Sequence, residues 1–278
     1  MWCLQDGRLF STGTTYLAVE KDFYKLDALT RDDIALIKML FDTGHPYSKR
    51  NHAKLLNDLM LPFQIAERIK DPKHREKMNE FLDGYTSDVL EDHHAQIEAT
   101  FIPILESALN GDISFYRDER AIPFLHYLST QFMRTKGIKE RSIEACRADG
   151  SADLSRVWNV LIHMFATNIG ADLYRCRRRR KLVLIHNQTE VPFITGDQPA
   201  INLKGTRPHP PKCLSIYYPL SPTLALLLAD LDEEPLFPSD LTSAQASTLN
   251  EQIFKASYRQ VFGKSRKSLE LFLREGDA

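Results

Sequence analysis

Apolar side chains recur with a helical period over most of the first 180 residues. In TRDDIALIKMLFD, Ile34, Ile37 and Phe41 share one face behind Thr30, a residue type that favours a helix N-terminus. KRNHAKLLNDLMLPFQIAERIK predicts a second helix, bent or divided at Pro62, and TSDVLEDHHAQIEATFIPILESALNGD a third, capped by Ser87. DERAIPFLHYLSTQFMRTKGIKERSIEA and ADLSRVWNVLIHMFATNIGADLYRCRRRRK continue the pattern, so residues 27–180 are expected to form a helical body.

The pattern then changes to extended apolar segments separated by Pro, Gly and Asn. KLVLIHN, PFITGDQPAINL and LSIYYPLSPTLALLLAD predict a small antiparallel sheet within residues 181–235. Residues 1–26 read as a β lead-in, and residues 236–278 return to a helical period. We therefore expect a single α+β domain, with a mainly helical body and a small antiparallel sheet in its C-terminal half.

Charge and cysteine usage narrow the class of protein. The 278 residues carry 36 basic and 37 acidic side chains, a net charge of -1, so attraction to nucleic acid or to an anionic membrane must be local. The four cysteines form no C-x-x-C pair, which disfavours a thiolate zinc site and a disulfide scaffold. No secretory leader is visible and no apolar run reaches bilayer length, so a cytoplasmic protein without a membrane partner is predicted.

Asp197 is the first candidate for chemistry, because VPFITGDQPAINL presents it at the end of a predicted strand. Gly196 permits unusual backbone angles and Pro199 restricts Gln198, so the strand should end sharply with the carboxylate at a rim. A carboxylate there can act as a general base or bind a divalent metal ion, the one cofactor that the pattern suggests. The alternative is an Asx-turn in which Asp197 bonds its own backbone.

Two predicted helix faces carry further polar candidates. Glu91, His94 and Glu98 in EDHHAQIE share one face, a metal-ligand spacing that also suits a solvated surface; Glu98 lies nearest the apolar stripe. Gln131 and Arg134 in LSTQFMRTKGIKER are flanked by core residues. A guanidinium beside an amide suits a phosphate or carboxylate group, and equally an internal ion pair to Glu98 or Asp197.

The run RCRRRRK concentrates positive charge in a chain that is otherwise close to neutral. Its arginines can contact several phosphates of a nucleic acid or nucleotide, and the candidates are Arg175, Arg177, Arg178, Arg179 and Arg180, followed by Lys181. The alternative is that they complement the dipole at a helix C-terminus. The sequence contains no P-loop, G-x-G-x-x-G or G-x-S-x-G motif, which disfavours the enzyme classes that carry these signatures.

Several segments occur in an order that resembles the bacterial family called domain of unknown function 4238. They are LAVEKDFYKL, QIEATFIPIL, QFMRT, FITGDQPAI, YYPLSPTLALLL and LNEQIFKASYRQVF, and they span nearly the whole chain. The resemblance implies that Asp197, Pro199, Glu98, Gln131, Arg134 and Asn250 occupy recurrent positions of the family, whose strand-end motif typically has Ser and Asn where this chain has Gly196 and Gln198. The family's usual His-x-Val-Pro-Gln opening is missing here, so we expect a late start or the loss of that element.

Two functional hypotheses follow from these residues. The first is an enzyme that hydrolyses or transfers a phosphate-containing substrate, nucleic acid included, in a defence or toxin setting. Asp197 and Glu98 would be catalytic, and Arg134, Gln131 and Asn250 would bind substrate. The second is a non-catalytic module for a protein or nucleic-acid partner, in which the same residues form a buried polar network. An enzyme requires these residues to converge on an open cleft, whereas a module requires them paired and closed.

Overall fold

The computed structural model describes residues 1–13, 20, 22–42, 46–205, 214–231 and 241–273. Its helices are α1 (Arg31–Phe41), α2 (Pro46–Arg68), α3 (Pro72–Leu109), α4 (Ala121–Met133), α5 (Lys136–Ala148), α6 (Trp158–Arg175), α7 (Ser243–Ala256) and α8 (Lys267–Glu270), with 3-10 turns η2 (Ser114–Arg117), η3 (Arg177–Arg179) and η4 (Leu271–Leu273). Its strands are β1 (Trp2–Gln5), β2 (Arg8–Ser11), β3 (Arg180–His186), β4 (Thr195–Gly196), β5 (Ile201–Asn202), β6 (Ser215–Ser221), β7 (Leu224–Asp230) and β8 (Gln260–Gly263).

The strands form two antiparallel sheets, which confirms the α+β class. One has the order β3-β7-β6-β5 and lies in the predicted C-terminal region; the other has the order β2-β1-β8-β4 and joins the two ends of the chain. The expectation of helix alone after residue 236 was wrong, because Gln260–Gly263 pairs with Trp2–Gln5. A pairing between segments about 250 residues apart leaves no local periodic signal.

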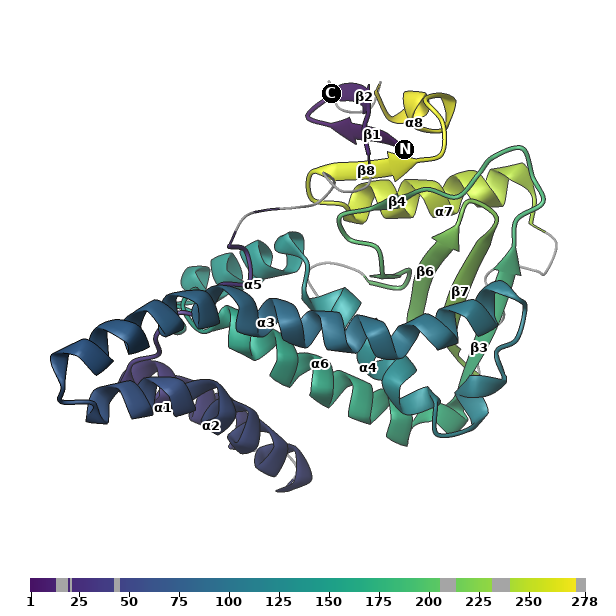
Figure 1. The fold of residues 1–278 in the computed structure, drawn as a ribbon. Helices are drawn as coiled ribbons and strands as arrows, with labels where there is room; N and C mark the ends of the chain where they lie inside the picture. Colours follow the sequence, from purple (N-terminus) through teal and green to yellow (C-terminus); the bar gives the residue numbers. More distant parts are fainter. Residues whose placement is uncertain (14–19, 21, 43–45, 206–213, 232–240, 274–278) are drawn as a thin grey trace.

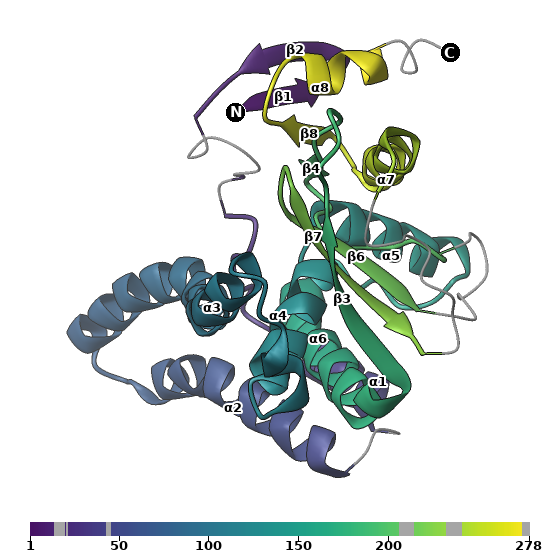
Figure 2. The same cartoon turned by 90° about the vertical axis from the view of Figure 1, so that its right-hand side faces the viewer.

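Sheet β3-β7-β6-β5 is covered on both faces, as Figures 1 and 2 show. Leu226 and Leu228 of β7 belong to the apolar cluster made with α3, α4 and α6, whereas Leu227 packs in a second cluster with residues of α7. That second cluster also holds Leu4 and Val261 of the smaller sheet. Helix α7 thereby connects the two sheets, and the continuous apolar run of β7 reflects burial on both sides.

The helices differ from the predicted ones mainly at their ends. Helix α3 begins at Pro72, where the Asp71 side chain caps it by accepting from the His74 N–H. Ser87 lies inside that helix and donates to the Asp83 carbonyl, so the prediction that it caps the helix was wrong. Helix α2 runs through Pro62 without division. Among the described residues, no helix combines the length and apolar character needed to cross a bilayer.

The segment predicted as one helix around residue 134 is two helices, and this break forms the site. Helix α4 ends at Met133 and α5 starts at Lys136. Thr135 takes an extended backbone (φ -80°, ψ 149°), and its hydroxyl donates to the buried Gln198 side chain instead of capping α5. A tertiary hydrogen bond therefore fixes the interruption, and the resulting turn brings Arg134, Thr135 and Lys136 to one place.

Candidate functional site

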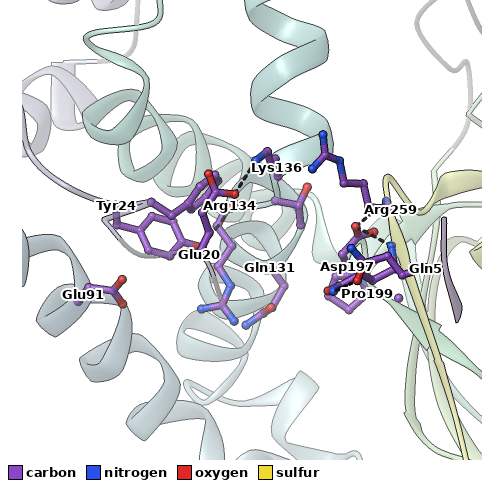
Figure 3. Close-up of a pocket in the computed structure, with 14 residues that line it drawn as sticks. Gln5, Glu20, Tyr24, Glu91, Gln131, Arg134, Lys136, Asp197, Pro199 and Arg259 are labelled. Atoms are coloured by element: carbon purple, nitrogen blue, oxygen red, sulfur yellow. Dashed lines mark hydrogen bonds and ion pairs between the residues drawn. The ribbon is translucent and has the colours of Figure 1, made fainter. Parts of the chain in front are cut away.

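A cleft of about 500 Å³ opens where the end of α4 meets α3, the segment before α1, and the edge of the smaller sheet. Figure 3 shows side chains from both ends of the chain and from its middle entering this one space. Its lining residues are Gln5, Glu20, Phe23, Tyr24, Glu91, Gln131, Arg134, Thr135, Lys136, Gly196, Asp197, Pro199, Arg259 and Gln260. The structure thus brings four of the candidate residues together: Glu91, Gln131, Arg134 and Asp197.

Gln131 and Arg134, at the end of α4, form what we call the cleft floor. Gln131 is only 3% exposed, yet its side-chain amide has no hydrogen bond to any described residue. In Figure 3 this amide and the Arg134 guanidinium lie next to each other. Tyr24 holds the backbone there by donating its hydroxyl to the Arg134 carbonyl at 3.1 Å. Because Gln131 lines the cleft, its amide can donate to, or accept from, a polar ligand there.

The acidic residues of α3 have separate positions around Arg134. Glu98 forms an ion pair with the Arg134 guanidinium at 2.5 Å between Oε1 and Nη1, and it lies outside the cleft lining. Glu91 lines the cleft and makes no hydrogen bond or ion pair with the described residues. Partial burial raises the pKa of the Glu91 carboxyl; the Arg134 charge opposes this shift, while Glu98 and Asp88 add to it. Glu91 is therefore the carboxyl group whose environment best suits proton transfer.

Asp197 is on the opposite side of the cleft and has its hydrogen-bonding capacity committed. Its two oxygens accept from the backbone N–H groups of Tyr258, Arg259 and Gln260 at 2.7, 2.7 and 3.1 Å. Its own N–H donates to the Gln260 carbonyl. The carboxylate therefore holds the turn between α7 and β8. Neither the catalytic hypothesis nor the local Asx-turn had predicted that Asp197 binds this distant backbone.

The neighbours of Asp197 complete a segment that we call the cleft wall, Gly196–Pro199. Gln198 is buried, and its side chain bonds the Thr135 hydroxyl and the carbonyls of Phe132 and Ala200. A Cβ added at Gly196 would lie 2.0 Å from the Ser257 hydroxyl oxygen and 3.0 Å from the Gln260 carbonyl oxygen. The lack of a Cβ at Gly196 thus allows the wall to approach the turn before β8. The wall is a saturated architectural element.

Two cationic side chains complete the cleft beyond its floor. Lys136, at the start of α5, forms an ion pair with Glu20. Arg259 extends in Figure 3 from the turn before β8 toward the Lys136 side of the cleft, and among the described residues it has no acidic partner for its side chain. The charges on Arg259 and Glu91 are therefore both available to a ligand.

Buried histidines pack behind the floor. The ring centres of His94 and His163 lie 4.6 Å apart, and the His94 ring packs at a tilt against Tyr24, with ring centres 4.3 Å apart. Both ring nitrogens of each histidine have no hydrogen-bond partner in the described structure. Burial, with the Arg134 and His93 charges, lowers the pKa of His94 to about 3, and burial also lowers the pKa of His163. Within the described ranges no group of three or more His, Cys, Asp or Glu side chains could hold a metal ion. The three residues of this helix face thus have separate places: Glu91 lines the cleft, His94 is in the core, and Glu98 pairs with Arg134.

The structure separates Asn250 and the arginine run from the cleft. Asn250, on α7, accepts from the Ile194 N–H and donates to the Pro192 carbonyl, so it fastens the strand that leads to the wall. The run crosses the end of α6, η3 and the start of β3, where Arg175 pairs with Asp172 and Arg180 with Asp230. Neither group lines the cleft.

Sequence reasoning had not selected Glu20, Tyr24, Lys136 or Arg259. Tyr24 and Arg259 lie within two of the segments that carry the family resemblance, and Lys136 is two residues from Arg134, so proximity to those segments was the available signal. A family model described as protein of unknown function (DUF4238) matches residues 3–267. The chain belongs to this family. No curated protein and no solved structure matches it. The match includes every residue that lines the cleft, from Gln5 to Gln260.

Proposed function

We propose that the cleft binds a small phosphate-containing substrate and that the protein hydrolyses it. The observation that carries this proposal is the amide of Gln131, which lines the cleft beside the Arg134 guanidinium and makes no hydrogen bond to the described residues. Arg134 uses one N–H on Glu98 and keeps further donors for an anion. Arg259 supplies a second cation, and Gln131 can donate to one phosphate oxygen and orient the group.

Glu91 takes the role of general base in this proposal, in place of Asp197 and Glu98. Water would attack phosphorus, Glu91 would accept the proton from that water, and the leaving oxygen would depart with its bonding electrons. The raised pKa of Glu91 moves it toward the range in which a carboxylate accepts a proton effectively. Asp197 would act indirectly, by holding the turn from which Arg259 reaches the cleft.

The test combines ligand-dependent melting with release of inorganic phosphate. Inorganic phosphate, pyrophosphate and nucleoside phosphates are offered to the wild type, Gln131→Met and Glu91→Gln. We expect stabilisation of the wild type, weaker stabilisation of Gln131→Met, and binding without phosphate release by Glu91→Gln. Glu106→Gln is the control, because Glu106 is an exposed acid on the same helix and outside the cleft lining. Unchanged ligand response in Gln131→Met would remove the cleft from consideration.

A second candidate, the non-catalytic interaction module, has its own supporting observation. The polar groups of Asp197, Glu98 and Asn250 are all bonded within the chain, as a structural network requires. The same melting experiment separates the candidates. A module predicts that the wild type and Gln131→Met respond alike to every phosphate compound and that neither releases phosphate, since the cleft would have no small ligand.

A further inference from the structure

A second concave surface lies between the end of α3, η2 and the start of β3, and we call it the basic hollow. It has a volume of about 690 Å³ and is lined by Gly111, Asp112, Ile113, Ser114, Tyr116, Arg117, Arg177, Arg178, Arg180, Lys181, Leu182 and Leu231. Helix α4 begins just after η2 and ends at the cleft floor, so its 13 residues put about 20 Å between the two sites. The basic hollow is therefore distinct from the proposed substrate cleft.

The charges in the basic hollow are strongly unbalanced. Its described lining includes five cationic side chains and one acid, Asp112. Asp112 already accepts from the Ser114 backbone N–H at 2.7 Å, and Arg180 faces Asp230 at 3.2 Å between Nε and Oδ1. Arg117 and Arg178 are exposed and make no hydrogen bond or ion pair with any described residue. Neighbouring cations repel one another, so an anion in the hollow would be stabilised above all by Arg117 and Arg178.

The geometry also separates the arginines that sequence alone had grouped. Arg177 is held against the Tyr174 ring, with its guanidinium 4.0 Å from the ring centre, and donates to the Tyr174 carbonyl at 3.2 Å. Arg179 is exposed and does not line the hollow, and Arg175 pairs with Asp172 on α6. The run is thus a set of positioned side chains on one concave surface, plus two members that lie outside it.

The lining favours phosphate groups over bases. The one aromatic residue among the described lining residues is Tyr116, which is only 8% exposed and so gives little surface for base stacking. Several cations around one concavity suit a ligand with high charge density, such as adjacent phosphate groups. We propose that the basic hollow binds a compact oligophosphate, either free or as the polyphosphate end of a nucleotide, at a site separate from the substrate cleft.

Titration calorimetry with tripolyphosphate tests this proposal, with Arg178→Ala and Arg179→Ala as a matched pair. Both variants remove one exposed arginine and the same charge, but Arg178 lines the hollow and Arg179 does not. We expect Arg178→Ala to weaken binding about tenfold, the effect of losing roughly one charge-assisted contact, and Arg179→Ala to change it less than about twofold. Arg117→Ala should match Arg178→Ala.

Three outcomes would overturn the proposal: no binding by the wild type, equal losses in the two variants, or tighter binding of a short single-stranded oligonucleotide at equal phosphate concentration. Equal losses would mean diffuse attraction to a basic surface, and preference for the oligonucleotide would mean a nucleic-acid site. A parallel titration with a nucleoside triphosphate shows whether the hollow prefers a free oligophosphate or the polyphosphate end of a nucleotide. Gln131→Met is expected to bind tripolyphosphate in the hollow as the wild type does, so failure of the cleft proposal leaves this result interpretable.

Discussion

The two sides of the cleft carry similar polar residues, which differ in whether the chain itself satisfies their hydrogen bonds. On the wall, Asp197 and Gln198 make three hydrogen bonds each to the surrounding chain. On the floor, Gln131 is as buried as Gln198, yet its amide has no partner among the described residues. Polar residue type and burial therefore do not identify a binding group. Whether the protein itself satisfies the group distinguishes architecture from a ligand site.

The largest expected effect is the loss of stability on Asp197→Ala. The substitution removes the acceptor of three backbone N–H groups in the turn before β8. Water can replace it in part at the two exposed ones, so we expect the free energy of unfolding to fall by about 3 kcal/mol. Denaturant unfolding measures this. Asp172→Ala, which removes an exposed carboxylate paired with Arg175, should change stability by less than about 1 kcal/mol. Wild-type stability in Asp197→Ala would contradict the distinction between wall and floor.

The two glutamines give the most direct comparison, because Met conserves the size of each side chain and removes its amide. Gln198→Met should lose about 2.5 kcal/mol, since it leaves the Thr135 hydroxyl and two backbone carbonyls without their partner. Gln131→Met should change stability by less than about 0.5 kcal/mol or increase it, because no described group loses a hydrogen bond. The same unfolding measurements serve both variants, and equal losses would show that Gln131 also has a structural partner.

A smaller loss of stability is expected when the pH is lowered, because the buried histidines behind the cleft floor must then bind protons. His94 titrates near 6.5 when unfolded, whereas its pKa in the folded protein is lowered to about 3 by burial and by the Arg134 and His93 charges. The unfolded chain thus binds more protons below pH 6.5, so stability is complete above that pH and falls as pH decreases toward 3. At pH 5 the loss from His94 alone should be about 2 kcal/mol relative to pH 7.5.

Comparing His94→Phe with the wild type at both pH values isolates this contribution. The substitution keeps an aromatic ring against Tyr24 and removes the titration, so the difference between pH 7.5 and pH 5 should shrink. His186→Gln, at an exposed position, should leave that difference unchanged. A wild-type pH dependence in His94→Phe would assign the acid sensitivity to other groups.

Local sequence patterns predicted part of the site and missed the rest for a definable reason. Gln131 and Arg134 were identified because polar residues interrupt an apolar helix face, and both line the cleft. Asp197 was identified from its strand-end position, but its backbone partners lie about 60 residues away on the turn before β8. Glu20, Lys136 and Arg259 have no distinctive local pattern. Their place in the cleft depends on which distant segments pack together.

The sequence by itself determined the α+β class, the helical body, the strands that follow residue 180 and the neutral overall charge with one basic run, because each depends on local periodicity or composition. The tertiary structure alone decided that β1 and β8 pair, that Thr135 separates α4 from α5, and that Gln198 is bonded while Gln131 is not. These outcomes depend on hydrogen-bond partners supplied by remote segments. A side chain's type specifies what it can bind, whereas the folded chain specifies which of those bonds remain for a ligand.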